Sequence, residues 1–82
     1  MLGYSRMADR SPLAHFSGPR LLGARHAIGL SRVRLCLEIG FAVGPQTLAR
    51  YERGRTAPSV DVAMRLAKAL HVTLWDLTDA EG

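Results

Sequence analysis

Gln46 and Arg50 could make paired hydrogen bonds with the edges of DNA bases. The carboxamide of Gln46 matches a donor and an acceptor of adenine, and the guanidinium of Arg50 matches two acceptors of guanine. The two residues are four apart, so a helix that begins at Pro45 would place both on one exposed face. Each correct pair is worth roughly 1–3 kcal/mol of discrimination between bases. The sequence therefore indicates specific contact with duplex DNA.

The charge of the chain also favours a polyanionic partner. Nine Arg or Lys residues and three acidic residues lie between Arg20 and His71, which gives this span a net charge of +6. The tail from Asp76 to Gly82 holds three acidic residues and carries −3. Clustered arginines and a pI near 10.2 in a small chain fit DNA. A basic surface that only contacts solvent is the alternative that charge alone leaves open.

The sequence predicts no enzyme, metal site or cofactor. His15, His26 and His71 are not spaced as metal ligands, and the single Cys36 cannot complete a zinc site, so we expect it in the core. No glycine-rich phosphate loop and no pair of carboxylates beside a histidine is present. One cysteine, no apolar leader and no run of about 18 apolar residues predict a cytoplasmic protein without a membrane span.

The spacing of apolar residues predicts one all-α domain with five helices. The 82 residues allow a single domain. Ser31, Ser59 and Thr73 are suited to cap helix starts, and glycines at 29, 40 and 54 are suited to follow helix ends. The expected helices cover residues 20–28, 31–40, 45–53, 59–70 and 74–77. Around them we expect a flexible or extended arm over 1–19, a domain over 20–78 and an acidic tail over 79–82.

Five short motifs occur in order along the chain. They are GLS at 29–31, TLARYERGR at 47–55, APS at 57–59, LAKAL at 66–70 and VTL at 72–74. With these motifs the stretch 21–77 resembles the Cro/CI-like (Xre) helix-turn-helix family. The resemblance implies a compact lambda-repressor-like fold whose second motif helix lies in the major groove. It also implies a transcriptional regulator, usually a dimeric repressor.

The resemblance also implies roles for single residues. Gln46 and Arg50 match positions that read bases, and Arg32 matches a position that touches the DNA backbone or a neighbouring base. Thr47, Arg53 and Arg55 look like phosphate contacts, which supply affinity and register. A glutamate at the position of Glu52 usually ties the end of the helix to the rest of the domain, so we expect a structural role, with Arg25 as the candidate partner.

The turn between the two motif helices is longer than in the family. Six residues, 41–46, separate Gly40 from Thr47, where the family has four. One alignment places Cys36 and Gly40 at the family's small positions and lengthens the turn, and the other places Glu38 and Ala42 there. The second would bury a carboxylate between close helices, at a cost of several kcal/mol without a partner, so we prefer the first.

The leading hypothesis is a prokaryotic or phage-encoded, nucleoid-associated regulator that binds duplex DNA as a homodimer. Homodimerisation is expected because one helix reads only a few base pairs, and because Leu74, Trp75 and Leu77 cannot all be buried by so small a core. These three either cap the domain or meet a second protomer. Two alternatives are an antitoxin or phage-control protein that also holds a protein partner, and a protein-interaction module that has lost DNA binding. The lengthened turn favours the last.

Overall fold

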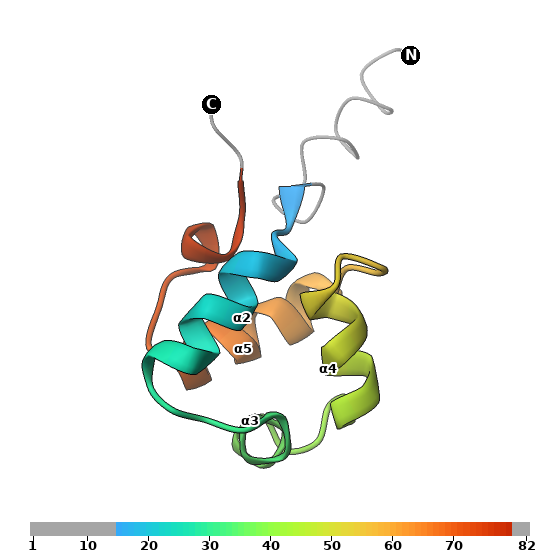
Figure 1. Cartoon of the computed structure of the whole chain (residues 1–82), viewed down its shortest axis with the longest axis vertical. Coiled ribbons are helices and arrows are strands. Elements are labelled where there is room, and N and C mark those ends of the chain that lie inside the picture. The colour runs from blue at the N-terminus through green and yellow to red at the C-terminus, as the bar shows by residue number, and fades with distance from the viewer. Residues whose placement is uncertain (1–14, 80–82) are drawn as a thin grey trace.

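The computed structural model describes residues 15–79, so expectations for residues 1–14 and 80–82 lie outside the described part. Figure 1 shows its helices in a compact arrangement. They are α2 (Gly18–Ala27), α3 (Arg32–Glu38), α4 (Pro45–Glu52), α5 (Val60–Leu70) and the 3₁₀ helix η2 (Leu74–Leu77). The all-α prediction is confirmed, but the last of the five expected helices is a 3₁₀ helix. None of the described helices has the length and apolar character needed to cross a membrane.

The folded region begins earlier than the sequence predicts. Helix α2 starts at Gly18, and the Ser17 hydroxyl caps it by accepting a hydrogen bond from the Arg20 N–H at 3.1 Å. The Ser17 N–H also donates to the Leu77 carbonyl at 2.8 Å, so the start of α2 is held by the end of the chain. A Cβ on Gly18 would collide with backbone carbonyls at the end of α4. Residues 16–19 therefore belong to the domain and not to an arm.

Each of the four described α-helices ends in the same pair of backbone hydrogen bonds. In α3 the N–H groups of Gly40 and Phe41 donate to carbonyls at 3.0 and 2.7 Å, which is the Schellman arrangement. Gly29 and Gly54 serve the same purpose in α2 and α4: both follow the helix end, as predicted, and both have positive φ. His71 takes the corresponding place in α5 at a φ of 61°. A residue with a Cβ is strained there.

The core lies where the four α-helices and η2 meet. Figure 1 shows α4 against one side of this bundle, and α4 packs on both α2 and α3. Cys36 is fully buried, as predicted, and burial raises the pKa of its thiol. The core cluster consists of Leu21, Leu35, Cys36, Ile39, Leu48, Tyr51, Leu66, Ala67, Leu70 and Leu77. Leu48 and Tyr51 therefore fix the inward face of α4.

The structure supports the alignment that lengthens the turn. Helix α3 ends at Glu38, and the side chain of that residue is 47% exposed instead of packed between helices. Cys36 occupies the buried position. Gly40 and Phe41 both have positive φ, at 67° and 55°, and they form the turn that follows α3.

His71→Gly should stabilise the protein. The left-handed conformation costs a residue with a Cβ about 1–2 kcal/mol, and glycine removes this strain. Glycine also loses more chain entropy on folding, which offsets about 0.5–1 kcal/mol of the gain. We expect the free energy of unfolding in urea to rise by about 0.5–1 kcal/mol. Gly29→Ala is the matched control: its Cβ would meet nothing within 4 Å, so only the backbone strain remains. The free energy of unfolding of the Gly29→Ala variant should fall by about 1 kcal/mol. A stability loss for His71→Gly would contradict this explanation.

Candidate nucleic-acid interface

Helix α4 presents one face to the core and the other to solvent. Gly44 precedes it and Pro45 opens it, as the sequence predicts, and the helix has no side-chain cap. The buried residues Leu48, Tyr51 and Glu52 follow a helical spacing. Gln46 and Arg50 are one turn apart on the opposite side and are exposed. The arrangement gives two long polar side chains a rigid base.

The structure brings two of the predicted site residues together. Arg32, at the start of α3, and Gln46, near the start of α4, line the same shallow hollow. Ser31, Val33, Pro45, Ala49 and the buried Arg25 complete its lining. Arg50 is exposed on the next turn of α4, and Thr47 is half-buried. Arg53 and Arg55 are exposed in the turn that follows α4, and neither lines the hollow.

A buried carboxylate connects three helices beneath this surface. Glu52, whose side chain is 2% exposed, accepts hydrogen bonds from Arg25 Nε at 2.7 Å and Nη2 at 3.2 Å. Arg25 Nη1 donates to the Leu30 carbonyl at 2.8 Å, in the loop that leads to α3. The predicted pairing of Glu52 with Arg25 is therefore confirmed. Glu52 ties the end of α4 to α2.

Arg32 is the second partner of Glu52, a contact that was not predicted from the sequence. Its Nε donates to Glu52 Oε1 at 2.9 Å, while its side chain remains 42% exposed. Burial alone would raise the pKa of Glu52, but hydrogen bonds from Arg25 and Arg32 outweigh that effect and lower it. Two guanidinium groups and one carboxylate leave a net charge of +1. The partly exposed side chain of Arg32 places positive charge at the hollow. The excess of arginines over acids around Glu52 is the only sequence signal for this contact.

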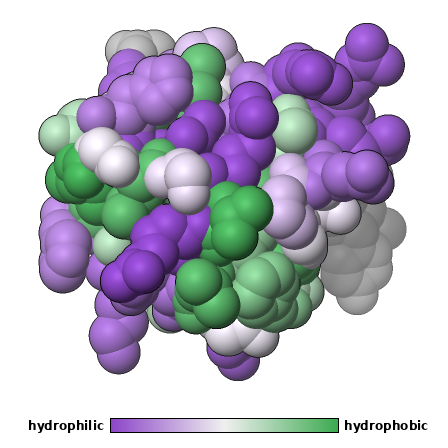
Figure 2. All heavy atoms as spheres, turned by 60° about the horizontal axis from the view of Figure 1, so that its bottom comes forward, coloured by the Kyte–Doolittle hydropathy of each residue, from purple (hydrophilic) through white to green (hydrophobic). Residues whose placement is uncertain are grey.

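The outer side of α3 carries exposed apolar residues beside charged ones. Figure 2 looks onto the side of the molecule that holds α3 and shows apolar side chains grouped among charged ones. Val33 and Leu37 are exposed on this helix, and Phe41 is exposed in the turn after it. Arg34 lies 3.7 Å from Glu38 in an exposed ion pair. Of the two arginines of α3, Arg32 and not Arg34 lines the hollow beside Gln46.

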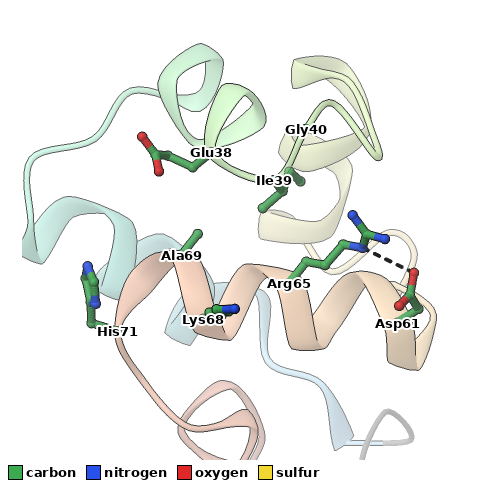
Figure 3. Close-up of a pocket in the computed structure, with 8 residues that line it drawn as sticks. All are labelled: Glu38, Ile39, Gly40, Asp61, Arg65, Lys68, Ala69 and His71. Atoms are coloured by element: carbon green, nitrogen blue, oxygen red, sulfur yellow. Dashed lines mark hydrogen bonds and ion pairs between the residues drawn. The ribbon is translucent and has the colours of Figure 1, made fainter.

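A second hollow, between the end of α3 and α5, contains none of the predicted site residues. Figure 3 shows its charged side chains around the rim, with Asp61 and Arg65 joined by a hydrogen bond of 3.3 Å. Its lining consists of Glu38, Ile39, Gly40, Asp61, Arg65, Lys68, Ala69 and His71. Two carboxylates among the basic groups make it less suited to DNA than the surface of α4.

Comparisons with known proteins agree with this geometry. A family model described as helix-turn-helix matches residues 24–74. The restriction-modification controller protein C.AhdI from Aeromonas hydrophila is 32% identical, with a TM-score of 0.67 over 73% of this chain and 84% of that chain. ComR from S. thermophilus, solved in complex with DNA and its signalling peptide ComS, is 32% identical, with a TM-score of 0.70 over 79% of this chain and 22% of that chain.

A third solved structure supports the fold alone. The P22 c2 repressor, solved in complex with a synthetic operator, is 23% identical, with a TM-score of 0.70 over 78% of this chain and 94% of that chain. No curated protein gives a significant match.

Glu52→Gln should destabilise the protein far more than Glu38→Gln. Loss of the Glu52 charge leaves buried Arg25 without its counter-ion, at a cost of about 3–5 kcal/mol. Glu38 takes part in an exposed pair, whose loss costs less than about 0.5 kcal/mol. Urea unfolding followed by circular dichroism measures both. Similar losses in the two variants would show that the buried cluster does not stabilise the fold.

Proposed function

The chain belongs to the Cro/CI-like (Xre) helix-turn-helix family of DNA-binding transcription regulators, and from that premise we propose that it represses transcription by reading duplex DNA with α4 in the major groove. The observation that carries the proposal is the outward face of α4, where Gln46 and Arg50 lie one turn apart above a packed core. The major groove admits a helix and displays a distinct pattern of donors and acceptors for each base pair. ComR was solved with DNA, which supports the same use here.

The remaining predicted residues lie around this face, where we propose that they contact the DNA backbone. Arg32 borders the hollow beside Gln46, and Arg53 and Arg55 are exposed beyond the other end of α4. Thr47 lies between the two ends. Cations at both ends of a reading helix would hold phosphates on the two sides of the groove and set its register. We assign base contacts to Gln46 and Arg50, and phosphate contacts to Arg32, Thr47, Arg53 and Arg55.

Two alternatives differ in their structural support. The lengthened turn favours a protein-interaction module without DNA binding. However, two left-handed residues accommodate this turn, and α4 packs in the core. An antitoxin or phage-control protein of the same fold would also hold a protein partner. Exposed Val33, Leu37 and Phe41 would suit such a partner, so this remains the second candidate. In either case we place the protein in the cytoplasm of a prokaryotic cell, at the nucleoid.

Trp75 supports the proposal of a homodimer. Leu77 is fully buried and closes the core, and Leu74 is half-buried. Trp75, between them in η2, is 61% exposed. Tryptophan is enriched among the residues that dominate protein interfaces. A two-fold arrangement would also double the number of base pairs that two α4 helices read.

DNA binding should depend steeply on salt. Three cationic phosphate contacts per protomer predict an affinity loss of about 40-fold per protomer between about 50 and 200 mM salt. Fluorescence anisotropy with a labelled mixed-sequence duplex measures this loss.

Arg55→Ala should weaken binding to all sequences and reduce the salt slope by about 1, whereas Arg50→Ala should relax preference at one base by about 1–3 kcal/mol. Selection from a random duplex pool reads the base preference. Absent or salt-independent binding would favour the interaction module.

Trp75→Ala should weaken self-association. Loss of a central interface tryptophan costs at least about 2 kcal/mol, which raises the dimer dissociation constant about 30-fold. Sedimentation equilibrium across a range of protein concentrations measures the constant. Leu37→Ala removes an exposed apolar side chain from α3 and should leave it unchanged. A dimer that dissociates with Leu37→Ala and persists with Trp75→Ala would place the interface on α3 instead.

A further inference from the structure

We propose that Glu52 is a positioning residue for DNA binding, because it holds Arg32 in place to bind a DNA phosphate. The proposal rests on the proposed function and adds a role for a buried residue that does not itself reach DNA. Arg32 lies between the two, since its Nε bonds to Glu52 at 2.9 Å while the side chain is 42% exposed at the hollow beside Gln46.

The shape of the guanidinium allows both contacts at once. It is a planar group with five N–H donors in a fixed fork. In the described part of the chain, Nε is the only atom of Arg32 that donates a hydrogen bond, so the edge formed by Nη1 and Nη2 remains available. A phosphate can accept two parallel bonds from that edge. Lysine could not reproduce this geometry, because its single ammonium has no second edge.

Arg25 fixes the position of the Glu52 carboxylate. Arg25 binds both of its carboxylate oxygens, and Arg25 in turn binds the Leu30 carbonyl. The side chains of Glu52 and Arg25 are almost fully buried. A chain of contacts thus runs from the loop between α2 and α3 through α4 to the surface at Arg32. Because its inner end is packed, Arg32 loses less conformational freedom on binding a phosphate than a free side chain would.

The other cations proposed to contact DNA lack such support. Arg50, Arg53 and Arg55 are exposed, and the described residues provide none of them with a side-chain hydrogen bond or ion pair. Each must be ordered by DNA itself. Arg32 also borders the same hollow as Gln46, so a phosphate held there would set the register of the first base contact.

The negative charge of Glu52 would also repel DNA phosphates. This repulsion acts against the gain in affinity that comes from positioning Arg32. Both oxygens of Glu52 are occupied by guanidinium donors, and its side chain is 2% exposed. The cluster of Arg25, Arg32 and Glu52 has a net charge of +1. The positioning effect should therefore exceed the repulsion.

Lysine substitutions test the proposal, because they preserve charge and remove only the fork. Binding of a labelled mixed-sequence duplex is measured at several salt concentrations for Arg32→Lys and for Arg55→Lys. We expect Arg32→Lys to lose about three- to tenfold in affinity, the advantage of an ordered side chain, and Arg55→Lys to lose less than about twofold. The salt slope should be the same in both, since the charge does not change. Equal losses in the two variants would overturn the proposal.

Two further measurements separate positioning from stability and from the proposed function. Ala63→Gly weakens α5 without touching the Glu52 cluster, and should leave the affinity of the folded protein unchanged. If it loses as much affinity as Arg32→Lys, the effect is merely structural and the proposal fails. NMR relaxation of the Arg32 Nε–H in the DNA-free protein should show an ordered group. Mobility equal to that of Arg55 would overturn the positioning, whereas failure of the unmodified protein to bind DNA would overturn the proposed function.

Discussion

The buried carboxylate of Glu52 is the constraint on which the helix-turn-helix arrangement depends. A charge removed from water is costly unless it is paired and fully hydrogen-bonded, and Glu52 meets that condition only with Arg25 and Arg32 in their observed positions. These partners come from α2 and α3, so one side chain requires three helices to meet in one geometry. Its backbone carbonyl takes part as well, because only glycine at position 18 allows α2 to pass so close.

Much of the fold follows from local sequence signals. Ser31, Ser59 and Thr73 each cap a helix start through the side-chain oxygen, and glycines at 29, 40 and 54 end helices with positive φ. The period of α4 predicts which of its side chains are buried. These features depend on neighbours a few residues apart, so a single sequence contains the information.

The features that the sequence did not reveal depend on residues distant in the chain. The start of α2 at Gly18 requires the carbonyls at the end of α4 and the Leu77 carbonyl, which no local pattern announces. Arg32 was predicted to touch DNA from its place at the start of α3, and its bond to Glu52 spans 20 residues. For Gln46 and Arg50, the helical period predicts exposure, whereas the chain holds no pattern that identifies the bases we propose they contact.

The lengthened turn illustrates how these constraints combine. Two extra residues between α3 and α4 would be expected to change the angle between the helices if the turn set that angle. In this turn Gly40 and Phe41 both adopt the left-handed conformation, and the Phe41 side chain is half exposed. The position of α4 is determined from its other end, where Tyr51 packs in the core and Glu52 is bound by Arg25 and Arg32. A turn outside these contacts can therefore be longer without removing the contacts that hold α4 in the core.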